Sequence, residues 1–433
     1  MKTKFAIVGL ICLAMVSGAE ALTLKESVDL ALKHNPSVLA SQKKLDAANA
    51  RLAQAVGAFF PNIKLSGNYT DIHSDPQILQ VNFGGQTQTF SVSSATATKA
   101  WTAALSQPIL QAGLFPGLKM AQRASDAAAQ DLQKTVNDTT YNVTAAYFGV
   151  LSADKLVKVA ADSLALANSH LTQVQAMLNS GVATRADLLR AEVQVANSEV
   201  ALTRARNNFD LARNTFNNVL GRSIDEPVEL SDILELTVPA LPDYAALLKS
   251  AYDSRPDWKN FLYNKDIAEA NLSLARTGYW PTINFSAQTG NTITDYPGFE
   301  SSVNAWSLTG AASWTIFDGL GTQNRINEAA ANLEVQKATE DSVRNSVALD
   351  VRNAYLNLKS VIETIASAKK AVDFADENYK VSSLRFNSGV GTNIEVIDAQ
   401  VALTQARTDF LKAQFDLEVS KARLNQAAGT VVL

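Results

Sequence analysis

Asn387-Ser388-Gly389-Val390-Gly391-Thr392 is the stretch that decides the fold, and Asn179-Ser180-Gly181-Val182-Ala183-Thr184 repeats it earlier in the chain. Each copy separates two long segments that lack proline and are rich in Ala, Leu, Val, Gln, Asn and charged residues. The glycine after the serine can adopt the left-handed conformation that ends a helix, and the threonine is a good N-cap for the next helix. Each copy therefore predicts the tip of a long antiparallel helical hairpin.

The whole chain follows this repeat. Ser180 and Ser388 are 208 residues apart, and the same offset relates Gly221 to Gly429, where the outgoing helices are expected to stop. The sequence is therefore a tandem duplication. We expect a first repeat at 22–221, an acidic connector at 222–241 and a second repeat at 242–433.

Aromatic-proline junctions mark a second pair of landmarks. Phe59-Phe60-Pro61 and Tyr279-Trp280-Pro281 each end a helix, and the helix begins 25 residues before that proline, at Pro36 or Pro256. Proline ends a helix and favours extended conformation in its neighbours, so a strand is expected after each junction.

The longest predicted elements are helices. We expect them at 117–178 and 323–386, with shorter returning helices at 185–219 and 393–428 and a short helix at 24–33. At 1.5 Å per residue each long helix would extend roughly 90 Å. Their apolar positions are sparse and often alanine, which favours a sheath of helices over a globular core.

The segments after the two junctions alternate between apolar and polar residues, which predicts strands with one apolar and one polar face. We expect four strands in two hairpins, with polar loops at 71–97 and 292–302. The predicted lipid-facing positions are Ile63, Leu65, Trp306, Leu308 and Trp314, and the predicted lumen-facing positions are Ser66, Thr102, Ser307 and Thr309.

The N-terminus resembles a secretory signal. Lys2 and Lys4 precede an apolar run, and Ala19-Glu20-Ala21 supplies small residues for cleavage, so a signal peptide is expected over 1–21. The only cysteine, Cys12, lies inside it. Without Lys2, Lys4 and Glu20 the mature chain has 36 basic and 41 acidic residues, and this mildly acidic balance argues against nucleic acid as a partner.

The mature chain has no apolar run near the roughly 18 residues of a membrane-spanning helix, so any crossing must be made by strands. Four strands cannot close a transmembrane barrel, which needs about eight, so strands from several chains must be pooled. Aromatic residues near the strands fit the membrane interface, although the core of a soluble β-sandwich is the alternative reading. These aromatics are Phe59, Phe60, Trp101, Tyr279, Trp280, Trp306 and Trp314.

With the duplication, the aromatic-proline junctions and the two Ser-Gly-Val tips, the chain resembles the TolC-like outer-membrane efflux proteins, the outer membrane factor family, over roughly 24–429. The resemblance implies a mixed, mainly α fold. It implies a homotrimer whose transmembrane β-barrel, with four strands per chain, is continuous with a long periplasmic α-helical barrel.

The same resemblance implies a function in the outer membrane, with a large periplasmic portion. The trimer would be the exit duct of a tripartite efflux or type I secretion system, and would work with a periplasmic adaptor and an inner-membrane pump. Drugs, metal ions and secreted polypeptides stay open as cargo.

The resemblance also suggests site residues. The adaptor-docking tips would be Gly181, Val182, Ala183, Thr184, Gly389, Val390, Gly391 and Thr392, although good turn chemistry alone is the simpler reading. Glu395 and Asp398 match the acidic pair of the periplasmic gate, and ordinary solvated charges are the alternative. Their first-half equivalents, Asp187 and Arg190, can pair with each other. A tyrosine and an arginine that help to close the tunnel in well-known members correspond here to Phe386 and Gly391, which puts those closing links in question.

No enzyme is expected, and no cofactor or metal. His34, His73 and His170 are scattered without metal-ligand spacing and are interpreted as solvated surface residues. Ser41-Gln42-Lys43-Lys44 matches Ser-x-x-Lys without the partner motifs of penicillin-binding enzymes. The alternatives to a channel are a periplasmic adaptor, which would have one helical hairpin and compact β-domains, and a coiled-coil scaffold.

Overall fold

The structure, a computed structural model, describes residues 21–73, 75, 77–92, 96–231, 238–296 and 298–430. The predicted signal peptide lies outside the described residues except for Ala21. The chain divides into two compact units, of which unit 1 is Met1–Lys43, Gln130–Trp258 and Val343–Leu433, and unit 2 is Lys44–Ala129 and Lys259–Ser342. Both units therefore take segments from both halves of the sequence.

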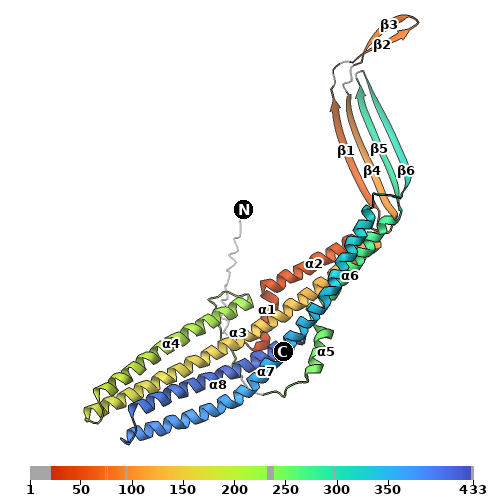
Figure 1. The fold of residues 1–433 in the computed structure, drawn as a ribbon. Coiled ribbons are helices and arrows are strands. Elements are labelled where there is room, and N and C mark those ends of the chain that lie inside the picture. The colour runs from red at the N-terminus through yellow and green to blue at the C-terminus, as the bar shows by residue number, and fades with distance from the viewer. Residues whose placement is uncertain are drawn as a thin grey trace, which may run out of the picture. The chain divides into compact units, whose positions relative to one another are not determined.

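The protein is mainly helical, and Figure 1 labels its elements. The two long hairpins are α3 (Leu114–Asn179) with α4 (Arg185–Leu220), and α7 (Gly321–Asn387) with α8 (Asn393–Ala427). The shorter helices are α1 (Leu24–His34), α2 (Pro36–Gly57), α5 (Tyr244–Ser254), α6 (Pro256–Arg276) and the single 3-10 turn η1 (Thr277–Tyr279). These bounds confirm the predicted helices to within a few residues. Within the described residues, no helix combines the length and the apolar character needed to cross a membrane.

The duplication is visible in equivalent contacts within unit 1. The side chain of Asn35, between α1 and α2, donates to the backbone oxygen of Val219 at 2.7 Å. Arg255, between α5 and α6, donates to the backbone oxygen of Ala427 at 3.0 Å. Val219 and Ala427 are related by the same 208-residue offset as the tips, so both halves anchor the end of the returning helix in the same way.

The glycines that end the returning helices are required by close packing. Gly221 has φ +75°, and a Cβ there would lie 2.7 Å from the backbone oxygen of His34. Gly429 has φ +74°, and a Cβ there would lie 2.8 Å from the backbone nitrogen of Arg255. A left-handed conformation and a neighbouring backbone together leave room only for glycine.

One antiparallel sheet in unit 2 has the order β1-β4-β5-β6. Its strands are β1 (Asn62–Ile72), β4 (Thr96–Gln111), β5 (Thr282–Tyr296) and β6 (Phe299–Ser313). The pairing of β4 with β5 joins the two halves of the sequence in the middle of the sheet. Among the described residues β1 and β6 each pair on one side only, so they form the two edges.

The strand register puts the predicted lipid-facing residues of the strands on one face of the sheet and the predicted lumen-facing residues on the other. Ile63 pairs with Leu105, and Leu65 pairs with Ala103, on the face that continues through Ala287 to Leu308. The other face carries Ser66, which pairs with Thr102, and Thr309, which pairs with Ser286. Trp314 lies one residue beyond β6, so its predicted position within the strand is wrong.

Both predicted polar loops contain strand. Residues 71–97 include a separate hairpin, β2 (Gln77–Phe83) with β3 (Gln86–Val92). Gly84 and Gly85, both with positive φ, supply the two-residue turn that a hairpin of this kind prefers. In the second loop the strands continue to Tyr296 and resume at Phe299, because ladder hydrogen bonds stabilise polar residues in strands as well as apolar ones.

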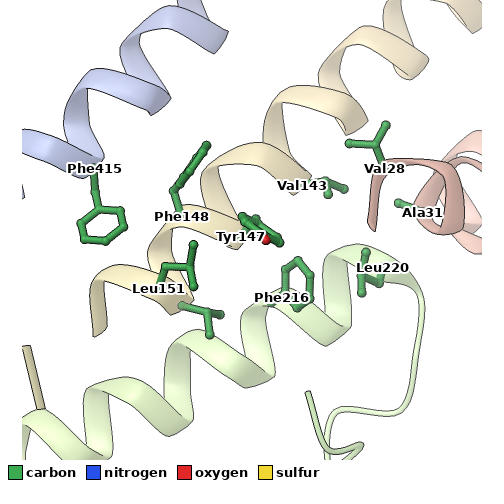
Figure 2. Close-up of a cluster of buried hydrophobic side chains, with 10 residues drawn as sticks. Val28, Ala31, Val143, Tyr147, Phe148, Leu151, Phe216, Leu220 and Phe415 are labelled. Carbon is green, nitrogen blue, oxygen red and sulfur yellow. The ribbon is translucent and has the colours of Figure 1, made fainter. Parts of the chain in front are cut away.

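A compact core lies in unit 1 where α1 meets the long helices, although the sequence favoured a sheath. Figure 2 shows Tyr147 of α3 next to Phe216 of α4, with ring centroids 6.1 Å apart, and Val28 of α1 belongs to the same cluster. The Tyr147 hydroxyl donates to the backbone oxygen of Ser231 at 2.8 Å, which satisfies its polar group. A second core cluster in the same unit contains residues of α5, α7 and α8.

Candidate functional site at the helical tips

The two long hairpins turn in the same way at their tips, in unit 1. Gly181 has φ +76°, and the backbone N–H of Val182 donates to the carbonyl oxygen of Met177 at 2.9 Å. The second tip repeats both features, with Gly389 at φ +72° and the equivalent hydrogen bond at 3.0 Å. A Cβ added at either glycine would meet open space, so conformation and not crowding requires glycine here.

Threonine caps the helix that leaves each tip, as predicted. Thr184 and Asp187 form a reciprocal capping box, which holds the pKa of the Asp187 carboxyl below its usual value. Thr392 accepts the backbone N–H of Glu395 at 3.4 Å. Asp187 also lies 3.9 Å from Arg190, so the predicted pairing of these two residues is confirmed.

An apolar side chain stands exposed at each tip. Val182 is 68% exposed and Val390 is 70% exposed. The residue that follows each valine is partly covered. At Gly391 a Cβ would lie 2.9 Å from the backbone nitrogen of Phe386, so this position is closed to any larger residue unless the turn shifts.

The predicted acidic pair lies one turn inside the second tip. Glu395 and Asp398 are both exposed on α8. Sequence reasoning missed Arg385, in the last turn of α7, whose Nε lies 3.7 Å from the Glu395 carboxylate. The signal was present, because a basic residue just before the turn faces an acidic residue just after it.

The interpretation of His170 as a solvated residue is wrong. Its side chain is only 3% exposed, and Nε2 lies 2.7 Å from Oδ1 of Asn393. Asn393 in turn donates to the backbone oxygen of Asp187 at 2.9 Å. Burial lowers the pKa of His170 more than its hydrogen bonds raise it. The other two histidines are exposed, as predicted.

Apolar packing surrounds this buried histidine and joins the two hairpins. The ring of Phe386 lies 5.2 Å from the imidazole and is itself 7% exposed. The buried members of this cluster are Val174, Leu188, Ala191, Phe386 and Val396. Phe386 has no hydroxyl group, so it contributes to the junction by packing and not by a hydrogen bond.

The aromatic residues near the strands form a second candidate surface, in unit 2. Trp306 is 76% exposed, and Trp101, Trp280 and Trp314 are also exposed. The indole N–H of Trp314 donates to the backbone oxygen of Tyr279 at 3.1 Å, which links the end of β6 to the second aromatic-proline junction. Phe60 is exposed, whereas Phe59 is half-buried against Phe115.

The described residues contain no group of three or more His, Cys, Asp or Glu residues placed to hold a metal ion. Ser41, the serine of the Ser-x-x-Lys match, is buried on α2. The hydroxyl of Thr135 donates to it at 3.4 Å. Its environment is therefore that of a packed helix residue.

Known families and proteins match nearly the whole chain. A family model described as outer membrane efflux protein matches residues 27–222 and 247–430. Outer membrane protein TolC of Escherichia coli (strain K12) is 23% identical, and the match covers 98% of this chain and 86% of that protein. Alkaline protease secretion protein AprF of Pseudomonas aeruginosa is 22% identical, with 98% of this chain and 88% of that protein covered.

A solved structure shares the fold. The Campylobacter jejuni CmeC outer membrane channel matches with a TM-score of 0.79 and 15% identity, covering 94% of this chain and 85% of that chain. At this identity the likeness establishes the fold alone. The segments that the family model matches contain both tips and all four strands of the main sheet.

Proposed function

Because the chain belongs to the outer membrane efflux protein family, we propose that it is the outer-membrane exit duct of a tripartite efflux or type I secretion system. The observation that carries this proposal is the extent of the family match, which includes both copies of the repeat with a helical tip in each. The family description names efflux, and the relative AprF is named for alkaline protease secretion, which supports both kinds of system.

The proposed assembly is a homotrimer with a pooled transmembrane barrel. The four-stranded sheet has edges at β1 and β6, and an open edge is not viable in lipid because its backbone groups would be unsatisfied. Edge pairing between three copies supplies enough strands to close a barrel, which one copy does not. The exposed apolar residues of the sheet, including Trp306 and Leu308, would then contact outer-membrane lipid.

Exposed apolar residues on the helices support the same assembly. Leu189, Val193, Val200 and Leu211 are exposed on α4, and their spacings of four, seven and eleven residues place them on one helix face. In a ring of identical subunits such a face packs on a different face of the next copy. Exposed Val381 and Leu384 of α7 supply apolar area for that contact. The helices would then form the periplasmic tunnel.

The tips are the proposed docking points for a periplasmic adaptor, which in turn links the duct to an inner-membrane pump. Turn chemistry explains Gly181, Thr184, Gly389 and Thr392. It does not require the exposed apolar side chains of Val182 and Val390, whereas an apolar contact with a partner does.

Glu395 and Asp398 are the proposed lining of the periplasmic gate. Both are exposed near the start of α8, so in a trimer six carboxylates would surround a narrow aperture. Such a ring attracts cations and binds multivalent ions. Arg385 lies close enough to Glu395 to offset part of that charge.

Membrane fractionation tests the proposed function directly. The duct is expected to resist carbonate extraction from the outer membrane, and to run as a trimer that dissociates only on heating. An adaptor or a coiled-coil scaffold would be extracted or would run as a monomer. A strain that lacks this protein should also be more sensitive to the cargo of the associated pump, or should no longer secrete that cargo.

A further inference from the structure

The contact between His170 and Asn393 joins four helices at one buried point. His170 comes from α3, and Asn393 is the first residue of α8. Asp187 lies in the first turn of α4, and Phe386 lies in the last turn of α7. Asn393 is 3% exposed, like His170. The point therefore couples the ends of both hairpins.

The hydrogen bonds fix the state of the imidazole. Asn393 uses its amide nitrogen to donate to the backbone oxygen of Asp187, so its amide oxygen is left to accept from His170. Nε2 of His170 must then carry the hydrogen. A proton gained by the neutral ring would go to Nδ1.

The surroundings of the imidazole offer little compensation for a positive charge. On α3 the side chain of Gln173 hydrogen-bonds the ring, and on α7 the neighbour is the aromatic ring of Phe386. On α4 the carboxylate of Asp187 hydrogen-bonds Asn393. That carboxylate also accepts two hydrogen bonds from Thr184 and lies 3.9 Å from Arg190, which offsets its charge. The charged group of α8 in this region, Glu395, is exposed and lies near Arg385.

We propose that His170 and Asn393 are positioning residues for the gate pair, and that acid releases the junction they form. This proposal rests on the proposed role of Glu395 and Asp398 at the aperture. Asn393 lies two residues before Glu395 and holds the first turn of α8 against α4. We call the junction closed when the His170 ring is buried, as in this structure, and open when the ring reaches water. A protonated ring in the closed junction is a buried cation, so protonation destabilises the closed junction relative to the open one.

The pH range follows from linkage. In the closed junction the pKa of His170 lies below its ordinary value of 6.5, whereas a solvated ring has the ordinary value. The open junction therefore binds more protons between these two values, so the closed junction loses stability as pH falls below about 6.5. Within that window the ratio of open to closed changes by up to about tenfold per pH unit for each site. Carboxyl groups ordinarily titrate near about pH 4. That value is well below about pH 6.5, where the closed junction begins to lose stability.

Planar-bilayer recordings with His170→Gln test the proposal. Glutamine keeps an N–H donor for Asn393 but does not ionise, so the variant should match the native channel near neutral pH. Lowering the pH to about 5.5 should raise the open probability of the native channel severalfold and leave the variant unchanged. His34→Gln, at an exposed site, should keep the native response. An equal response in native and His170→Gln channels would overturn the proposal.

A labelling measurement on the otherwise native junction covers the case in which His170→Gln does not fold. Ala191, 1% exposed in the same cluster, is replaced by cysteine in a chain with Cys12→Ser. Its labelling rate, relative to that of Val182→Cys at the exposed tip, should rise severalfold between about pH 7.5 and 5.5. A constant ratio would overturn the acid release. The absence of channels in every bilayer would instead contradict the proposed function.

Discussion

The guanidinium of Arg385, at the end of α7, lies 3.7 Å from the carboxylate of Glu395, at the start of α8. Both side chains are about half exposed, so the pair contributes little to stability, between 0 and about 1 kcal/mol. Its consequence is electrostatic. Glu395 carries a nearby countercharge from its own chain, whereas among the described residues no ion pair of Asp398 is found.

We therefore expect Glu395 and Asp398, the carboxylates of the proposed gate, to contribute unequally to cation selectivity and to block by multivalent cations. Asp398→Ala should reduce cation selectivity and block by multivalent cations more than Glu395→Ala does, and the double variant should reduce both further and change conductance. The measurements are the reversal potential and the block of planar-bilayer currents at about 0.1 M salt. Wild-type selectivity and block in the double variant would show that these residues do not line the gate.

Arg385→Ala supplies the matched control, because it should act in the opposite direction. Removing the guanidinium leaves Glu395 without its countercharge, so cation selectivity and multivalent block should both increase. The increase should largely disappear at about 1 M salt, where the screening length is near 3 Å. An effect that is insensitive to salt would point to a change in tip structure and not to charge.

The helical part of the fold was predictable because its signals are local. The Gly-Thr turns at residues 181–184 and 389–392 stop one helix and cap the next, and the predicted positions of both hairpins are confirmed. The β2–β3 hairpin was missed although the sequence carries a local signal for it. Gly84-Gly85 separate two short runs that contain β-branched and aromatic residues, and such a pair of runs is typical of a hairpin.

The candidate site was only partly predictable. The exposed valines at the tips follow from their position in a turn. The burial of His170 depends on Asn393, which lies 223 residues further along the chain, and no local pattern reports such a contact. The sequence offset aligns the two hairpins with each other but does not say which of their faces meet.

The exposed valines are expected to act in docking. Val182→Asp combined with Val390→Asp should leave a folded trimer, because both side chains are largely in solvent, but efflux or secretion should fall to the level of a strain lacking the duct. The measurement is transport in cells that contain the pump and adaptor, together with the amount of heat-dissociable trimer. Val182→Thr with Val390→Thr controls for shape, since threonine has the shape of valine without a charge. Unchanged transport with the double aspartate variant would exclude the docking role.

The sheet faces are expected to differ in access to water. Single cysteines at Ile63, Leu65, Trp306 and Leu308 should resist a water-soluble thiol reagent, whereas cysteines at Ser66, Thr102, Ser307 and Thr309 should react. The register places each set on one face, and a one-residue change of register would exchange the sets. Trp306→Cys and Ser307→Cys form the sharpest pair, because they are neighbours in β6. Labelling of the first set with protection of the second would contradict the proposed barrel.

Gly221 is expected to be more sensitive to substitution than its conformation alone predicts. Gly221→Ala places a Cβ in a left-handed conformation and 2.7 Å from the backbone oxygen of His34, so we expect a loss of about 2–4 kcal/mol in the free energy of unfolding. Gly181→Ala has nearly the same φ but open space around the new Cβ, so its loss should be about 1–2 kcal/mol. Gly149→Ala, inside α3 with open space, should stabilise the helix by roughly 0.5–1 kcal/mol. Thermal unfolding followed by circular dichroism measures the order of the three variants. Equal losses for Gly221→Ala and Gly181→Ala would show that the contact between the end of α4 and the end of α1 does not constrain the fold.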